Sequence, residues 1–159
     1  MPIRWDSLLV RHTTNELRQK LEGTQLRAIR FDRQKRDVLV IFQDKTLVWR
    51  LHPSKGHLVF ANSITPAKSD YRFRGKLRVV EAPDDERIVR FGLPPARSGP
   101  VNLIIELLGN QWNALITEGD PGITRHVLWQ RTGKATNRAV GQLYKPCLLY
   151  TSPRPRDRG

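Results

Sequence analysis

The sequence predicts an α+β fold that is mainly β, with two antiparallel sheets packed as a sandwich and one helix at the N-terminus. Three observations support this prediction. A segment with helical periodicity precedes Gly23, short apolar runs separated by turn residues follow it, and part of the first group of runs recurs in the second. Because each sheet has an apolar face that needs cover, two similar groups of strands predict two sheets that pack together.

The first element is a helix predicted over Ser7–Glu22. Side chains suited to one apolar stripe recur at every fourth residue, namely Leu9, Thr13, Leu17 and Leu21, with Val10 beside them. That spacing brings them to one face of a helix. Asp6 or Ser7 is placed to accept backbone N–H bonds from the first turn. Gly23 suits the position after the last turn because it tolerates positive φ.

Nine later segments alternate polar and apolar residues or form short apolar runs, and these are predicted strands. They are Gln25–Phe31, Asp37–Phe42, Thr46–Leu51, His57–Ala61, Lys76–Ala82, Glu86–Gly92, Val101–Leu108, Trp112–Glu118 and Ile123–Trp129. Asp44–Lys45 and Pro53–Gly56 are predicted turns within the first group. Ser63–Asp70, which contains Pro66, is expected to be a loop or at most a short helix.

The internal repeat is visible as an alignment without gaps. Leu47–Ala61 aligns with Leu103–Thr117, so that apolar runs fall on apolar runs with turns of equal length between them. Two of the fifteen aligned pairs are identical. The repeat therefore predicts two similar sheets, and the alternative is that ordinary strand patterning produced the match.

Charge is the strongest compositional signal of function. Lysine and arginine number 28 against 15 acidic residues, which gives a formal net charge of +13. A field of this sign favours polyanions, since each neutralised phosphate releases counterions, and it predicts binding to ribosomal or transfer RNA. The alternative is that the charge only keeps the domain in solution.

We expect a cytoplasmic protein with no membrane partner. The chain has no apolar run of the roughly 20 residues that a transmembrane helix needs, and its single cysteine, Cys147, fits a reducing compartment. Residues 1–146 are the predicted domain. Residues 147–159, with prolines among arginines, are predicted to be a disordered tail of non-native origin. Removing the three arginines and one aspartate of Thr151–Gly159 lowers the net charge only from +13 to +11.

Four segments, taken in order, resemble the N-terminal domain of the NFACT family, also called fibronectin-binding protein A-like proteins and bacterial RqcH. Asn15–Phe42 looks like the family's helix that contains Asn-Glu-Leu, together with the glycine and the strands that follow it. Arg74–Phe91 is similar to the part of the family in which an Asp-Arg pair precedes a strand. Leu103–Gly119 resembles the family's paired apolar strands, and Arg138–Pro146 its closing Arg…Gly-x-x-Tyr-x-Pro run. The resemblance covers nearly all of residues 1–146.

The resemblance implies a fold similar to the N-terminal domain of formamidopyrimidine-DNA glycosylases, and a role in ribosome quality control. Family members bind the large ribosomal subunit that carries a stalled nascent chain on peptidyl-tRNA, and they recruit tRNA to extend that chain with a C-terminal tail. The family's coiled-coil arm and C-terminal RNA-binding domain are not in this sequence. The resemblance therefore implies a truncated, RNA-binding piece with no enzymatic activity and no cofactor.

The resemblance also implies three nucleic-acid contacts: Glu86 and Arg87, which match the family's acidic–arginine pair, and Asn113, the one retained residue of its Arg-His-Ser-Asn turn. On chemistry alone, the alternative for Glu86–Arg87 is a solvated turn with a surface ion pair, and the alternative for Asn113 is an ordinary turn residue. Trp112 either stacks on a base or packs on the core. The family's helix between the two halves is reduced here to Ala67–Leu77.

No catalytic or metal-binding motif stands out. The four histidines have no further ligand at metal-binding spacing, and P-loop, GxGxxG, HExxH and GxSxG patterns are absent. One enzymatic alternative is a DNA glycosylase, because the amine of Pro2, once Met1 is removed, is able to form a Schiff base. Ile3 stands where those enzymes have glutamate. A further alternative, suggested by the family's other name, is a fibronectin-binding or adhesion module.

Overall fold

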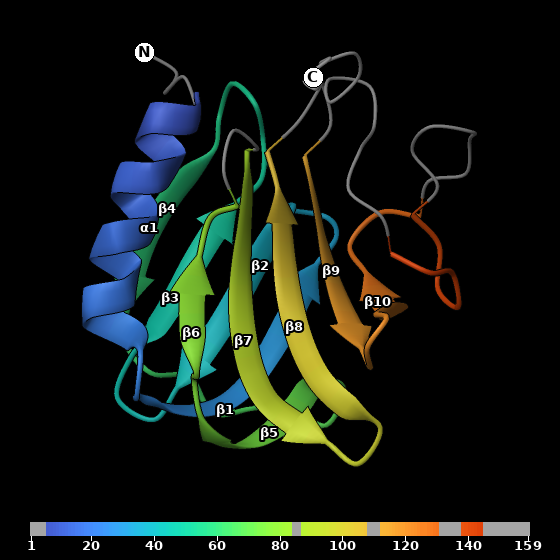
Figure 1. Ribbon diagram of the computed structural model, residues 1–159. Coiled ribbons are helices and arrows are strands. Elements are labelled where there is room, and N and C mark those ends of the chain that lie inside the picture. Colours follow the sequence, from blue (N-terminus) through green and yellow to red (C-terminus); the bar gives the residue numbers. More distant parts are fainter. Residues whose placement is uncertain (1–5, 84–86, 108–111, 131–137, 145–159) are drawn as a thin grey trace, which may run out of the picture.

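The computed structural model describes residues 6–83, 87–107, 112–130 and 138–144. These residues form two five-stranded antiparallel sheets packed face to face, with one helix beside them (Figure 1). The predicted fold class is therefore confirmed. The division into a domain and a tail is not tested, because residues 147–159 lie outside the described residues.

The elements follow the predicted order, with one additional strand. They are α1 (Ser7–Leu21), β1 (Gln25–Asp32), β2 (Asp37–Phe42), β3 (Thr46–Arg50), β4 (His57–Ala61), β5 (Tyr71–Lys76), β6 (Val79–Glu81), β7 (Ile88–Ala96), β8 (Gly99–Glu106), β9 (Asn113–Glu118) and β10 (Ile123–Val127). Helix α1 is the one helix among the described residues. It is too short and too polar to cross a lipid bilayer.

Helix α1 begins at the predicted residue and ends one residue earlier than predicted. The Asp6 side chain accepts a hydrogen bond from the backbone N–H of Leu9 at 2.9 Å and so caps the first turn. Gly23, just past the last turn, has a φ of 83°, a conformation that glycine adopts without strain. The predicted apolar stripe faces the core, where its most buried members lie: Val10, Leu17 and Leu21.

The helix covers one side of the sandwich, between edge strands of the two sheets (Figure 1). Toward β4, Lys20 Nζ lies 5.5 Å from the centre of the Phe60 ring. Toward β6, Arg18 Nε donates to the carbonyl oxygen of Val80 at 2.9 Å, and the Val80 N–H donates to Glu22 Oε2 at 2.9 Å. Helix α1 therefore links the two sheets at their edges.

The first sheet contains a meander of four consecutive strands, and the second sheet is a meander of five. The strand orders are β4-β3-β2-β1-β5 in the first sheet and β10-β9-β8-β7-β6 in the second. The repeat seen in the sequence is preserved in register. Leu47 pairs with Phe60 in the first sheet, and Leu103 pairs with Ile116 in the second, which are the positions that the gapless alignment equates. The two sheets differ in where the last strand of each pairs. Strand β5 pairs with β1, the first strand of its sheet in the sequence, whereas β10 pairs with β9, the strand just before it.

Strand β5 is not among the strands that the sequence predicts. The resemblance implies a reduced linker helix over Ala67–Leu77, and the sequence pattern predicts a strand over Lys76–Ala82. The chain instead forms β5 at Tyr71–Lys76 and a short β6 at Val79–Glu81. The reason is the alternation in YRFRGK. Exposed cations alternate with half-buried residues, as in an edge strand with one face on the core and the other in solvent.

Between β5 and β6 the chain passes from one sheet to the other. Gly75 has a φ of 124°, and a Cβ at this position would lie 3.3 Å from the ring of Pro94, so both the backbone and the packing favour glycine. Backbone hydrogen bonds fix the link. Leu77 exchanges two with the exit of α1, at 2.9 and 3.0 Å, and the Arg78 N–H donates to the Gly92 carbonyl at 2.8 Å.

The core lies between the sheets and takes large side chains from both. Among the largest fully buried ones, Phe42 and Trp49 come from the first sheet and Phe91 from the second. Trp112 is 6% exposed and packs in the same core. Of the two predictions for Trp112, packing on the core is therefore the one that the structure shows.

Candidate nucleic-acid interface

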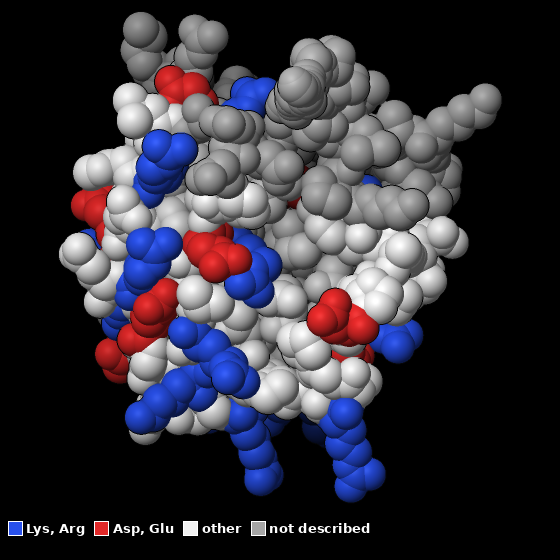
Figure 2. All heavy atoms as spheres, in the orientation of Figure 1, with Lys and Arg blue, Asp and Glu red and all other residues white. Residues whose placement is uncertain are grey.

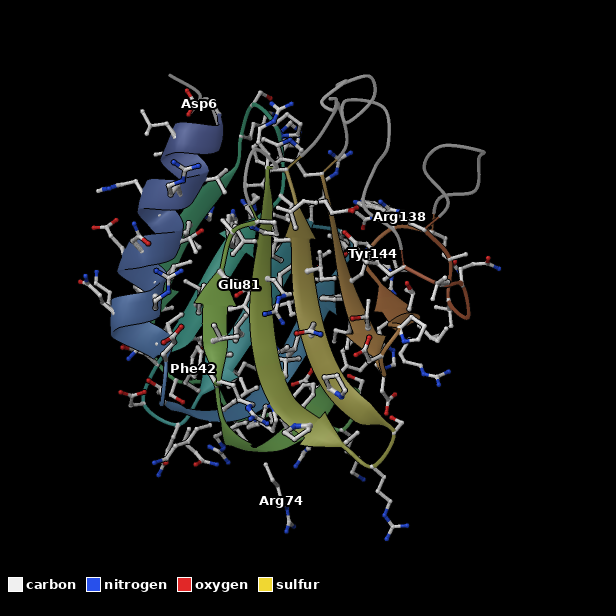
Figure 3. The ribbon with its side chains drawn as sticks, viewed as in Figure 1. Asp6, Phe42, Arg74, Glu81, Arg138 and Tyr144 are labelled. Carbon is white, nitrogen blue, oxygen red and sulfur yellow. The ribbon has the colours of Figure 1, made fainter. Side chains whose placement is uncertain are left out.

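The outer face of β5 is basic. Since successive side chains of a strand point to opposite faces, exposed cations lie on one face of β5 and half-buried aromatic rings on the other. The cations are Arg72, Arg74 and Lys76, and the rings are Tyr71 and Phe73. Arg74 extends from the lower edge of the sandwich into solvent (Figure 3). None of the three cations is among the contacts predicted from the sequence, although the alternation in YRFRGK is a signal for such a strand.

An open hollow of about 780 Å³ lies beside this row. Its polar lining consists of three arginines and two amides: Arg27, Arg72, Arg74, Gln25 and Gln43. A β-bulge between Leu26 and Ala28 interrupts the pairing of β1 with both of its neighbours, and the intervening Arg27 is exposed. The hollow therefore gathers guanidinium groups from two adjacent strands without a carboxylate in its lining.

Most ion pairs among the described residues join carboxylates to arginines that do not line the hollow. The arginines that pair with them outside α1 are Arg30, Arg50, Arg90, Arg125 and Arg138. Arg27 and Arg74 form no ion pair within the part of the chain that the structure describes, and Arg72 donates to the carbonyl oxygen of Pro66 at 3.3 Å. Figure 2 shows Lys and Arg side chains projecting from the lower edge of the molecule. The hollow therefore carries an excess of positive charge.

The loop before β5 is held by a buried carboxylate, Asp70. Its side chain is 1% exposed and accepts hydrogen bonds from Arg30 Nε and Nη2, each at 2.8 Å, and from the Ala67 N–H at 2.8 Å. The hydrogen bonds from Arg30 hold the pKa of Asp70 below its ordinary value. Because Asp70 directly precedes Tyr71, this ion pair fixes where β5 begins and so positions the cations on it.

The structure places Arg87 away from the basic row. Arg87 is exposed and directly precedes β7, and its carbonyl oxygen accepts the Leu107 N–H at 2.8 Å. Its predicted partner Glu86 lies outside the described residues. The far end of β7, at Ala96, lies near β5. A strand rises about 3.3 Å per residue, so Arg87 stands roughly 30 Å from that end of β7.

Asn113 is buried, contrary to what a nucleic-acid contact requires. It is 1% exposed. Its Oδ1 accepts the backbone N–H groups of Ala114 at 2.9 Å and Trp129 at 3.0 Å, and its Nδ2 donates to the Trp129 carbonyl at 3.0 Å. The amide thus ties β9 to the chain after β10. An RNA contact would require these bonds to break, so Asn113 is not part of the interface in this conformation.

The histidines of the described residues have local roles. No group of three or more His, Cys, Asp or Glu side chains among the described residues is placed to hold a metal ion. His52 Nδ1 accepts the Lys55 N–H at 3.0 Å in the turn before β4. His126 stacks on Tyr71. Pro2, on which the glycosylase alternative depends, lies outside the described residues.

Comparison with known proteins identifies the fold. No protein-family model matches the chain, and no curated protein matches it in sequence. The N-terminal domain of the fibronectin-binding protein PavA from Streptococcus pneumoniae is similar in structure, with a TM-score of 0.69 and 17% identity, over 89% of this chain and 61% of that one. The N-terminal part of the fibronectin/fibrinogen-binding protein FBPS from Streptococcus suis is similar to the same extent, with a TM-score of 0.69, 18% identity and the same coverage. The chain therefore has the fold of these N-terminal domains and spans about 61% of their length.

Proposed function

We propose that this domain is an RNA-binding module, without catalytic activity or a cofactor, whose basic surface around β5 contacts phosphate groups. One observation carries the proposal. Arg27, Arg72 and Arg74 line a single open hollow, and no carboxylate is among the residues that line it. The planar fork of arginine matches the oxygen geometry of phosphate. The net charge of +13 adds long-range attraction to a polyanion.

The arrangement of the cations favours a chain of phosphates over a single small anion. Arg72, Arg74 and Lys76 occupy alternate positions of one strand, which repeat at about 6.7 Å. They therefore form a line along the sheet edge, and Arg27 extends this line sideways onto β1. A linear polyanion is able to contact all four, whereas a lone phosphate contacts one or two.

The specific target in this proposal is transfer RNA on the large ribosomal subunit that carries a stalled nascent chain, as in ribosome quality control by NFACT proteins. The support is the order of the four sequence segments that resemble the NFACT N-terminal domain, together with the fold shared with the PavA N-terminal domain. In this role the protein acts in the cytoplasm. Glu86 and Arg87 contact tRNA beyond the start of β7, and the β5 row contacts a separate stretch of RNA.

The salt dependence of tRNA binding tests the basic row. We expect the logarithm of the affinity to fall linearly with the logarithm of the salt concentration, since bound phosphates release counterions. The triple variant Arg27→Gln/Arg72→Gln/Arg74→Gln should lower the slope by roughly 0.7 to 0.9 for each phosphate that the variant no longer neutralises. Fluorescence anisotropy with labelled tRNA measures both the affinity and the slope.

The matched control removes three exposed cations elsewhere: Arg11, Lys35 and Lys55. It has the same net charge as the triple variant, so it separates a local site from a general effect of charge. Equal slopes for the two variants would show that the hollow has no special role.

A second comparison, Arg87→Ala against Arg11→Ala, tests the contact at the start of β7. If Arg87→Ala binds tRNA as tightly as wild type, the proposal that Arg87 contacts tRNA is wrong.

A second candidate function is fibronectin binding, because the two similar structures are described as fibronectin-binding proteins. The two functions predict different results with one protein sample. An RNA-binding module binds tRNA with strong salt dependence and leaves immobilised fibronectin unbound. Binding to fibronectin without measurable binding to tRNA or large ribosomal subunits would replace the RNA proposal with the adhesion one.

A further inference from the structure

A second pocket, of about 400 Å³, adjoins the basic hollow. Its volume is within the range of about 300–1,000 Å³ that is usual for small-molecule sites. Arg72, Phe73 and Arg74 line both the hollow and this pocket. The hollow extends from them onto β1, whereas the pocket extends onto β7, β9 and β10 of the second sheet. Strand β5 therefore lies between the hollow and the pocket.

The lining of the pocket includes a pair of stacked rings. Tyr71 of β5 and His126 of β10 have ring centroids 3.8 Å apart and planes inclined by 20°, and both side chains are half-buried. Phe31 packs edge-on against Tyr71 at 5.6 Å and so restricts its orientation. Phe73 adds a further aromatic ring to the lining. Tyr71 and Phe73 also pack against the core, and the part of their surface that lines the pocket is able to contact another planar group.

The pocket also holds a hydrogen-bond acceptor, Glu118. Its Oε1 accepts Arg125 Nε at 3.2 Å, and its Oε2 accepts the hydroxyl of Ser98. An ionised carboxylate has about four acceptor positions, so two positions remain available to a ligand. Carboxylates accept from the amino group of cytosine, and they disfavour a base that presents a carbonyl at the same place.

We propose that this pocket binds one base of single-stranded RNA, with a preference for cytosine over uracil, while the flanking phosphates lie on Arg27, Arg72 and Arg74. The inference rests on the proposed function and adds a base-reading site to it. It follows from the alternation along β5, where guanidinium groups and aromatic rings lie on opposite faces of one strand. Stacking on aromatic side chains is the usual way in which proteins hold unpaired bases.

The test compares three single-stranded ligands of about eight nucleotides, a length within the site size of many single-strand binding domains. They are oligocytidylate, oligouridylate and an abasic chain with the same phosphates. We expect oligocytidylate to bind roughly tenfold more tightly than the abasic chain, with oligouridylate between them. Tyr71→Leu and Phe73→Leu should each remove most of this difference. Phe60→Leu, on the exposed edge strand β4 outside the pocket, should keep it.

Glu118→Gln gives a second measure that does not depend on ring packing. It should lower the ratio of the affinities for oligocytidylate and oligouridylate, whereas the loss of one negative charge should raise the affinity for all three chains to a similar extent. If wild type binds the abasic chain as tightly as oligocytidylate, no base enters the pocket and the inference is wrong, while the phosphate contacts of the proposed function stand. If none of the three ligands binds in a salt-dependent way, both proposals are wrong. Circular dichroism spectra establish that each variant is folded.

Discussion

Glu106 on β8 and Arg138 form a buried ion pair: Arg138 Nη2 lies 2.9 Å from Glu106 Oε2, and the two side chains are 6% and 8% exposed. Arg138 Nε also donates to both carboxylate oxygens, at 3.0 and 3.1 Å, and the hydroxyl of Tyr144 donates to Oε2 at 2.9 Å. The Arg138 guanidinium lies over the Tyr144 ring, 4.9 Å from its centre. Two of the four segments that resemble NFACT proteins therefore meet in one network, which holds residues 138–144 against the second sheet.

We expect Arg138→Met to destabilise the domain by about 3 to 5 kcal/mol, because it leaves the carboxylate of Glu106 buried and unpaired. Urea denaturation followed by circular dichroism measures the decrease in the free energy of unfolding. The control is Arg125→Met, which breaks the more exposed pair with Glu118 and should cost less than about 1 kcal/mol. Equal decreases for the two variants would contradict a special role for the buried pair.

We expect Asp70→Asn to destabilise the domain by about 1 to 3 kcal/mol at neutral pH, because it weakens the charged hydrogen bonds to Arg30. The effect should depend on pH. The pKa of Asp70 is lowered in the folded state from its ordinary value of 3.8, chiefly by the hydrogen bonds from Arg30. Its contribution is therefore complete above pH 3.8 and is lost as the pH falls below that value. Denaturation curves at pH 7 and at progressively lower pH should show the wild type and the variant converging, and a constant difference would argue against this assignment.

We expect the contribution of His126 to the stability of the domain to decrease in mild acid. Burial lowers the pKa of His126 from its ordinary value of 6.5, Arg33 and Arg125 act in the same direction, and Glu118 opposes them. Since the folded state favours the neutral ring, the contribution of His126 to stability is complete above pH 6.5. It decreases as the pH falls from there toward the lower folded-state pKa.

The measurement for this prediction is the melting temperature of the wild type and of His126→Phe between about pH 7.5 and pH 5.5, which spans the ordinary titration of histidine. His126→Phe keeps a flat ring but cannot be protonated, so its melting temperature should fall less in acid. His12→Phe, on the exposed face of α1, should retain the full dependence of the wild type. If His126→Phe also retains it, the acid sensitivity has another origin.

The elements with local signals could be predicted from the sequence. Helix α1 has its cap at Asp6 and its exit at Gly23, and both are consequences of residue chemistry within one turn. The hairpin of β8 and β9 has the register that alignment with β3 and β4 implies, since turns of equal length between the apolar runs give the two hairpins the same pairing. These features depend on neighbours in sequence.

The candidate site could not be predicted in the same way. Tyr71 and His126 meet because edge strands of different sheets superpose, and no local pattern specifies that superposition. The composition around Asn113 suits an exposed turn as well as a buried amide, and only the position of Trp129 decides between them. Strand β5 does have a local signal in its alternation, although the resemblance predicts a reduced linker helix over Arg72 and Arg74 instead.

The short link from β5 to β6 has a consequence for the kinetics and thermodynamics of binding. Leu77 is bonded to the exit of α1 and Arg78 to β7, so the strand that carries the basic row is anchored at its end to both halves of the domain. The backbone that carries its cations is thus held in place before any ligand arrives. Association should then require little ordering of the backbone, so that RNA is captured by a rigid surface, with a rate set mainly by diffusion and charge.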